Sequence, residues 1–191
     1  MTETRKIIVI GGSAGSLSVV LYILQNLPSN FIIPIVIILH RLKNIPSEID
    51  KIISLKRSDL KVKEPDDKEP VYQGYIYIAP ANYHLLVETD ATFSLDYSEP
   101  VHYSRPSIDV TFESVAQFYG SNATAVLLSG ANEDGTAGLF AIIEKGGTAL
   151  VQSPESSEYP IMPAAAIRKN EGVQIFSPQG IVKYLEKISP F

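Results

Sequence analysis

The sequence predicts an α/β protein with a doubly wound, mostly parallel sheet, a Rossmann-like three-layer arrangement, and an appended antiparallel hairpin. Short apolar runs rich in Ile, Val and Leu, typical of strands buried on both faces, alternate along the chain with segments of helical periodicity. Between residues 60 and 100 the pattern changes to short runs that alternate polar and apolar residues, which is typical of hairpins.

Residues 7–40 make the first unit of the predicted fold. Residues 7–10 are a short β-branched run that ends at glycines, as a buried parallel strand does. Residues 16–27 carry apolar side chains at the spacing of one helix face, and Pro28 ends that helix. The apolar run of residues 34–39 supplies the next strand, so the three segments form a βαβ unit.

The same alternation returns in the second half of the chain. In order, the patterns predict a helix over residues 107–118, a strand over 123–128, a helix over 136–145, a strand over 147–151 and a closing helix over 179–188. Between the two halves, apolar positions such as Tyr75, Tyr77, Leu85 and Phe93 are assigned to antiparallel hairpins. The mixed-charge stretch of residues 61–69 predicts a solvated loop.

Length and charge limit what the protein can be. Residues 1–191 are expected to form one domain, with a core large enough to fold without disulfides or a metal. The chain has no cysteine, and its net charge of −5 argues against a nucleic-acid or anionic-membrane partner. Residues 1–5 lead straight into the first strand, and Pro34 interrupts the longest apolar stretch. We therefore expect no signal peptide, no membrane insertion and a cytoplasmic location.

A glycine-rich turn follows the first strand and suits two chemistries. Gly11, Ser13 and Gly15 fit the G-x-S-x-G elbow, which holds a serine hydroxyl above the end of a sheet. Dinucleotide-binding folds place a similar turn there, but their G-x-G-x-x-G pattern, aligned on Gly12 and Gly15, needs glycine at Ile10. The motif favours a nucleophilic serine and leaves a nucleotide- or phosphate-binding module as the alternative.

The second strand ends at His40, where a nicotinamide-binding fold would carry an acidic residue for the ribose. Because the carboxyl ends of parallel strands lie at one edge of the sheet, His40 is expected beside Ser13, in the position of a general base. A strand-tip histidine can also be simply exposed to solvent. His84 and His102 are weaker candidates for the base.

A serine–histidine pair needs an acid that orients the imidazole, and Asp134 is the candidate. It follows a buried strand at the same edge of the predicted sheet and precedes a helix. Asp134 could instead be the N-cap of that helix. Glu133 and Asp109 are rivals for the acid. The order Ser, His, Asp differs from that of the α/β-hydrolases, which argues against that family.

Six stretches of the chain resemble the catalytic domain of the chemotaxis protein-glutamate methylesterases of CheB type. They occur in the order of that family and are IGGSAG (10–15), IILH (37–40), GYIYIAP (74–80), RPSIDV (105–110), LSGANEDG (128–135) and, more weakly, YPIMPAAA (159–166). Each motif is weak alone, but their common order across nearly the whole chain is specific.

The resemblance implies a doubly wound domain with Ser13, His40 and Asp134 as the catalytic triad. It implies a substrate methylated on glutamate side chains of the cytoplasmic helices of methyl-accepting chemoreceptors, and deamidation of glutamine in some members. Two departures are clear. Family members usually carry an N-terminal receiver domain, whereas here the first strand is expected from residue 7; the sequence therefore predicts either a trimmed form or a stand-alone form whose regulator is unknown. Their loop commonly reads Gly-Met-Gly-x-Asp-Gly, where this chain has Ala131 after Gly130, which affects substrate specificity more than the chemistry.

The expected reaction is ester hydrolysis through an acyl-enzyme on Ser13, without metal or cofactor. The oxyanion would be held by backbone N–H groups, with Ala14, Gly130 and Ala131 as candidates. Arg105 is a candidate substrate contact because it lies in one of the matching motifs; an exposed loop arginine is the other interpretation. A non-catalytic receptor-binding protein of the same fold is a further alternative.

Overall fold

The computed structural model describes residues 6–41 and 48–189, and the predicted domain range 1–191 extends beyond them at both ends. Within these residues a seven-stranded parallel sheet stands beside a two-stranded antiparallel one. The strands are β1 (Ile7–Gly12), β2 (Ile35–Leu39), β3 (Lys61–Lys63), β4 (Tyr75–Ile78), β5 (His84–Val87), β6 (Phe93–Asp96), β7 (Ala123–Leu127), β8 (Thr148–Gln152) and β9 (Gln174–Phe176). The α-helices are α1 (Ser16–Asn26), α2 (Ile49–Lys56), α3 (Ile108–Tyr119), α4 (Thr136–Glu144), α5 (Ile161–Lys169) and α6 (Pro178–Ile188).

The strand order of the large sheet is β3-β4-β2-β1-β7-β8-β9, so the winding changes direction at β1. The chain leaves β1 toward β2 on one side and returns on the other side at β7. Open α/β sheets bind their ligands at the carboxyl ends of the strands at such a point. Ser13 follows β1 there, and residues 128–134 follow β7.

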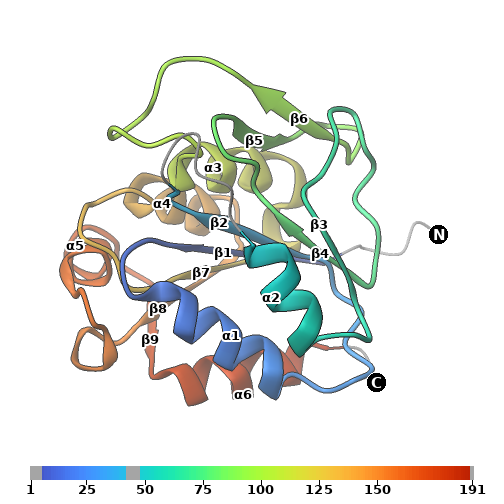
Figure 1. Ribbon diagram of the computed structural model, residues 1–191. Helices are drawn as coiled ribbons and strands as arrows, with labels where there is room; N and C mark the ends of the chain where they lie inside the picture. The colour runs from blue at the N-terminus through green and yellow to red at the C-terminus, as the bar shows by residue number, and fades with distance from the viewer. Residues whose placement is uncertain (1–5, 42–47, 190–191) are drawn as a thin grey trace.

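Two layers of helices cover the sheet (Figure 1). Side chains of α1, α2 and α6 pack on one face, and those of α3, α4, α5 and the β5–β6 hairpin pack on the other. Every residue of β1 is buried, with Ile7 and Val9 on one face and Ile8 and Ile10 on the other. This alternation explains why the first strand is a continuous apolar run. None of the described helices has the length and apolarity needed to cross a bilayer.

The predicted fold class is confirmed, including the parallel sheet and the appended β5–β6 hairpin. Two details of the middle segment are wrong. Tyr75 and Tyr77 lie in β4 of the large sheet, where Ile76 and Tyr77 are buried on opposite faces. The stretch 61–69, assigned to a solvated loop, begins with the edge strand β3, because Val62 packs on the core between two lysines that alternate away from it. Helices α2 and α5 and strand β9 were not predicted.

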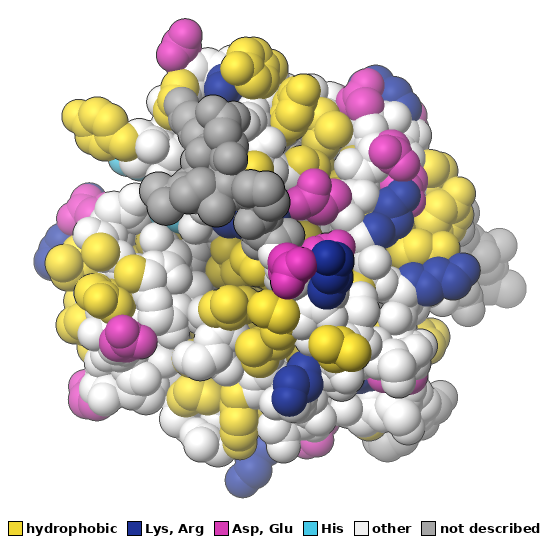
Figure 2. Space-filling view, viewed as in Figure 1, with side chains coloured by type: hydrophobic (Ala, Val, Ile, Leu, Met, Phe, Trp, Pro, Cys, Tyr) yellow, Lys and Arg dark blue, Asp and Glu magenta, His cyan; other side chains and the backbone are white. Residues whose placement is uncertain are grey.

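The charged surface is mixed in sign. On the face shown in Figure 2, lysine and arginine side chains lie among acidic and apolar ones. Elsewhere in the described residues as well, opposite charges are paired, such as Lys51 with Glu48 and Lys63 with Glu69.

The turn from β7 into α4 depends on Gly135. Its φ is 91°, in the left-handed region, and it is the residue that precedes α4. A Cβ at this position would lie 2.5 Å from Leu127 Cδ1 and 2.8 Å from Ile108 Cγ2. Gly74 has a similar φ of 74°, but no atom lies within 4 Å of its Cβ position.

Gly135→Ala is therefore expected to lower the free energy of unfolding by roughly 2–5 kcal/mol, the sum of left-handed strain and overpacking. Gly74→Ala, which adds the strain alone, is expected to cost about 1–2 kcal/mol. Urea unfolding of both variants measures the difference. Equal losses would show that the contacts with Leu127 and Ile108 do not constrain the turn.

Candidate active site

The backbone around Ser13 is held from two sides. The Ser13 N–H donates to Ser129 O (2.9 Å), and Ser13 O accepts both the Ser16 N–H (3.1 Å) and the Ser16 hydroxyl (2.6 Å). Gly15, with φ 75°, completes the turn into α1. The serine of the predicted elbow thus stands, half-buried, in a fixed turn at the carboxyl end of the central strand.

His40 lies directly beside this turn. Gly12 and Leu39 pair in the sheet, and the His40 N–H donates to Gly12 O (3.3 Å), so the residues after these partners are neighbours. No hydrogen bond joins the Ser13 and His40 side chains among the described residues; their backbones place them together. In structures without substrate such a contact is often long or poorly aligned.

The candidate acid contacts the candidate base directly. His40 Nε2 lies 2.7 Å from Asp134 Oδ2, and the two side chains are 12% and 0% exposed. With Nε2 bound to the carboxylate, Nδ1 is the nitrogen left to accept a proton. The two ring nitrogens are thus exchanged relative to the serine-protease arrangement, in which Nδ1 faces the acid.

Asp134 is held by four further donors. Its Oδ1 accepts the Ser107 hydroxyl (2.9 Å) and the N–H groups of Asp109 (3.0 Å) and Gly135 (3.0 Å), and its Oδ2 accepts the Ile108 N–H (2.7 Å). The carboxylate therefore lies at the N-terminus of α3 and does not cap α4, which follows it in sequence. Burial acts to raise the pKa of Asp134, but the hydrogen bonds from His40, Asp109 and Ile108 outweigh it and hold the pKa below its usual value.

The two rivals for the acid lie elsewhere. Asp109 is buried, accepts the Gly138 N–H (2.7 Å) and faces His102 (3.3 Å). Its burial raises its pKa to about 6 against the hydrogen bond from Gly138, and the nearby Asp134 charge adds to the rise. Glu133 is paired with Lys169, which holds the Glu133 pKa low. Of the three acids, Asp134 is the one bonded to His40.

The other histidines have different surroundings. His84 is buried, and its Nδ1 accepts the Ser107 N–H (3.1 Å), so its Nε2–H donates to Glu99 O (3.0 Å). This pattern fixes the orientation of the His84 ring, which supports Ser107 and, through it, Asp134. The His102 side chain is half exposed and meets Asp109.

The oxyanion candidates differ in the use of their N–H groups. The Gly130 N–H already donates to Tyr159 O (3.0 Å), which removes it as a free donor. The N–H groups of Ala14 and Ala131 donate no hydrogen bond within the described chain. Because the Ser13 carbonyl points to Ser16, the trans peptide turns the Ala14 N–H to the opposite side, away from α1.

Arg105 is used within the protein. Its Nη1 donates to Tyr97 O (2.9 Å) and Ser98 O (2.6 Å), and its guanidinium lies 3.9 Å from the centre of the Tyr97 ring. These contacts hold the loop after β6. A contact with substrate stays a prediction.

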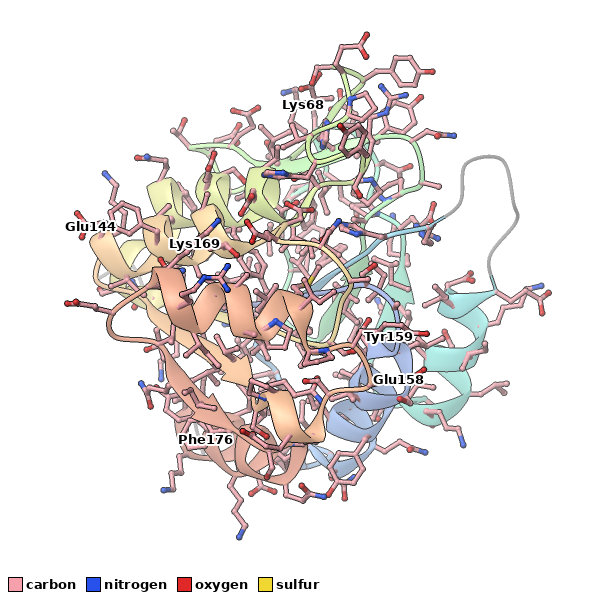
Figure 3. The ribbon with its side chains drawn as sticks, turned by 90° about the vertical axis from the view of Figure 1, so that its left-hand side faces the viewer. Lys68, Glu144, Glu158, Tyr159, Lys169 and Phe176 are labelled. Carbon is pink, nitrogen blue, oxygen red and sulfur yellow. The ribbon has the colours of Figure 1, made fainter. Side chains whose placement is uncertain are left out.

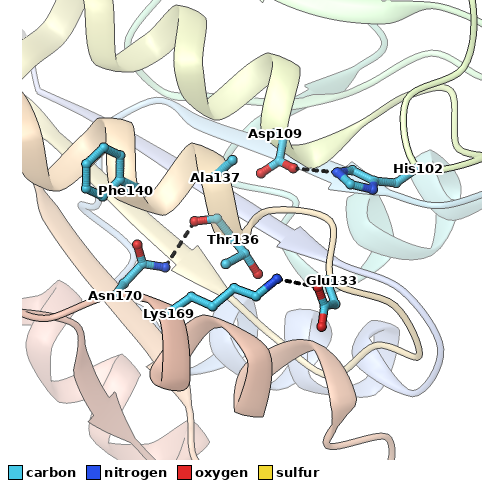
Figure 4. Close-up of a pocket in the computed structure, with 8 residues that line it drawn as sticks. All are labelled: His102, Asp109, Glu133, Thr136, Ala137, Phe140, Lys169 and Asn170. Atoms are coloured by element: carbon cyan, nitrogen blue, oxygen red, sulfur yellow. Dashed lines mark hydrogen bonds and ion pairs between the residues drawn. The ribbon is translucent and has the colours of Figure 1, made fainter.

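A pocket of about 330 Å³ is lined by residues of α3 and α4 and by residues at the C-terminal end of α5 (Figure 4). Its lining includes neither Ser13 nor His40 and consists of His102, Asp109, Glu133, Thr136, Ala137, Phe140, Lys169 and Asn170. One nitrogen or oxygen atom each of His102, Asp109 and Asp134 lies within 4.8 Å of the others. Both Asp134 oxygens already accept hydrogen bonds, so we interpret this group as one hydrogen-bond and charge network.

Two supporting residues were missed from the sequence. Ser129 is buried; its hydroxyl donates to Ala14 O (2.8 Å) and accepts the Tyr159 N–H (2.9 Å), tying three loops together. Ser107 precedes α3 and bonds Asp134. A serine just before a helix is a recognisable signal for a helix N-terminus, but the pattern cannot show that the helix holds an acid from another loop.

The chain matches the CheB methylesterase family model over residues 8–185. It belongs to this family. A Leptospira interrogans protein, provisionally named protein-glutamate methylesterase/protein-glutamine glutaminase, is 43% identical over 92% of this chain and 91% of its own length. A Thermotoga maritima protein of the same name is 36% identical over 86% of this chain and 48% of its own length. The crystal structure of the Thermotoga maritima CheB methylesterase catalytic domain superposes with a TM-score of 0.89 at 32% identity, covering 96% of this chain and 98% of that one.

The two neighbouring carboxyls are expected to affect stability in opposite directions. At pH 8, Asp109→Asn should raise the free energy of unfolding by roughly 1–3 kcal/mol, because the fold disfavours the ionised form of a carboxyl whose pKa is raised to about 6. As the pH falls from 6 toward the ordinary value near 4, the wild type regains this stability and the difference disappears.

Asp134→Asn should instead lower the free energy of unfolding, by roughly 1–3 kcal/mol at pH 7, because an amide replaces an acceptor of several donors. Because the pKa of Asp134 is lowered in the folded protein, its carboxylate stabilises the fold at pH values above the pKa of the unfolded chain. This stability is lost as the pH falls through the pKa of the folded state, so the cost of Asp134→Asn shrinks below about pH 4. Denaturant unfolding across pH measures both variants. If both substitutions changed the free energy of unfolding in the same direction at pH 8, the different environments assigned to the two carboxyls would be contradicted.

Proposed function

We propose that this protein is a protein-glutamate methylesterase that hydrolyses γ-methyl esters of glutamate side chains through an acyl-enzyme on Ser13. The observation that carries the proposal is the 2.7 Å bond between His40 Nε2 and the buried Asp134 carboxylate, beside the Ser13 turn. A base oriented by an ionised acid next to a serine elbow is the arrangement of serine hydrolases. The family match and the names of the relatives support this chemistry.

In the proposed reaction, His40 Nδ1 takes the Ser13 proton as Ser13 Oγ attacks the ester carbonyl. Asp134 stabilises the imidazolium that forms, and its ionised state at neutral pH follows from its lowered pKa. The Ala14 N–H, with Ala131 as a second donor, faces the developing oxyanion. His40 then gives its proton to the departing methoxide, which leaves as methanol. Water, activated by His40, cleaves the acyl-enzyme and releases glutamate.

The same steps hydrolyse a glutamine side chain with ammonia as the leaving group. The relatives carry both activities in their names, so we include glutamine deamidation in the proposal. We further propose that the substrate lies on the cytoplasmic helices of methyl-accepting chemoreceptors and that the protein acts in the cytoplasm, and the membership in the CheB methylesterase family supports both proposals.

The phosphate-binding alternative is disfavoured by Glu158. A Cβ placed on Gly15 would lie 2.9 Å from a Glu158 carboxylate oxygen, so an acidic side chain stands at the N-terminus of α1 (Figure 3). A phosphate bound by this turn would occupy the same place and be repelled. The non-catalytic alternative predicts binding without turnover, which the following experiment tests.

Ser13→Ala is expected to lower kcat for methanol release from a methylated receptor fragment by about 10⁴-fold or more, because no nucleophile remains. Ser18→Ala, at an exposed position on the next helix turn, is the matched control and should keep wild-type turnover. Fragment binding, measured separately, should survive in both variants. Turnover by Ser13→Ala would remove the proposed nucleophile, and binding without turnover by the wild type would favour the non-catalytic alternative.

A further inference from the structure

The proposed reaction does not use two titratable groups in the pocket of Figure 4, Asp109 and His102. Asp109 lies in the first turn of α3 with its side chain 6% exposed, and its Oδ2 is 3.3 Å from His102 Nε2. Its own N–H donates to Asp134 Oδ1 (3.0 Å). A line of contacts thus runs from His40 through Asp134 and Asp109 to His102 at the surface.

We propose that Asp109 and His102 are positioning residues that control how much of the Asp134 charge acts on His40. Their proximity to Asp134 gives the mechanism, since one polar atom from each of His102, Asp109 and Asp134 lies within 4.8 Å of the others. When Asp109 is ionised, Asp134 keeps its full negative charge for the imidazolium. When Asp109 is protonated, its O–H faces the Asp134 carboxylate and draws part of that charge away. This inference rests on the proposed function and concerns the same site.

The position of Asp109 makes its proton labile in the neutral range. Two buried carboxylates side by side cannot both ionise freely. Burial raises the pKa of Asp109 to about 6, with the hydrogen bond from Gly138 opposing and the Asp134 charge adding to the rise. Asp134, which accepts more donors, keeps the charge.

When it carries a proton, His102 favours the ionised form of Asp109, because its charge lies beside that carboxyl. Its side chain is 52% exposed. It is presented by a tight turn closed by the Val101–Ser104 bridge, in which His102 and Tyr103 both have left-handed φ, 47° and 61°. Non-glycine residues adopt this conformation at a cost. The turn therefore holds the ring over Asp109 from a fixed point of the backbone.

The other charged groups at the pocket are already paired, so they affect the charge state of Asp109 less than His102 and Asp134 do. From the loop before α4, Glu133 is paired with two cations of α5, Lys169 at 2.5 Å and Arg168 at 3.2 Å. From α4, the Gly138 N–H contributes a dipole that does not titrate. Asp134 and His102 are thus the ionisable neighbours of Asp109 that change its charge state.

The test follows the Asp109 carboxyl carbon and the His40 ring nitrogens by NMR against pH. In the wild type, the Asp109 signal should titrate near 6, and the His40 signal should show an inflection at the same pH, separate from the change caused by protonation of the His40 ring itself. Asp109→Asn should abolish that inflection. His102→Gln, which keeps a hydrogen-bond donor but not the charge, should move the Asp109 midpoint upward by roughly half a unit to one unit. His102→Lys, a permanent cation, should move it back.

Glu133→Gln is the matched control, because it removes a charge from the same pocket at a side chain 44% exposed and paired with lysine. It should leave the His40 inflection in place. In turnover assays, His102→Gln should lower kcat/KM at pH 6.5 relative to pH 8.5, and His102→Lys should restore the wild-type profile. The inference would be overturned if the Asp109 midpoint were the same in His102→Gln as in the wild type. It would also be overturned if the His40 inflection persisted in Asp109→Asn. The NMR outcome does not depend on substrate, so it is separate from failure of the proposed esterase activity.

Discussion

The burial of one ionised carboxylate, that of Asp134, is the constraint on which the site depends. A buried carboxylate is tolerated when donors surround it, and here the first turn of α3, the Ser107 hydroxyl and His40 all supply them. These donors come from segments distant in sequence. The same contacts that satisfy the charge therefore fix α3 and the His40 ring against the loop after β7.

The sheet supplies the rest of the precision. Ser13, His40 and Asp134 follow three adjacent strands, β1, β2 and β7, whose pairing is set by backbone hydrogen bonds. Ser129 adds a polar tie at the centre, since its main chain and hydroxyl bond the elbow on one side and Tyr159 on the other.

The parts of the fold that were predictable are those in which a local pattern decides the outcome. Buried strands such as β1 are apolar throughout, and the helices on either face keep their period, so both were visible in the sequence. Edge strands β3 and β9 are three residues each and carry charged or polar residues, so their pairing comes from tertiary context. Likewise, residue type and strand order indicated His40 and Asp134 as candidates. Packing alone decides which ring nitrogen of His40 contacts Asp134, and it also decides that the Gly130 N–H is already bonded.

The pairing of β1 with β7 also bears on how the molecule acquires its site during synthesis. Ile7 lies beside Ala123, and Gly11 beside Leu127. One of the two neighbours of β1 is therefore synthesised long after β1 itself. Contacts so distant in sequence form late and slowly, and transiently unpaired strand edges favour aggregation. A nascent chain therefore cannot assemble the serine, the imidazole and the acid until the second half has left the ribosome. Products truncated before β7 would carry Ser13, the proposed nucleophile, and His40 without Asp134.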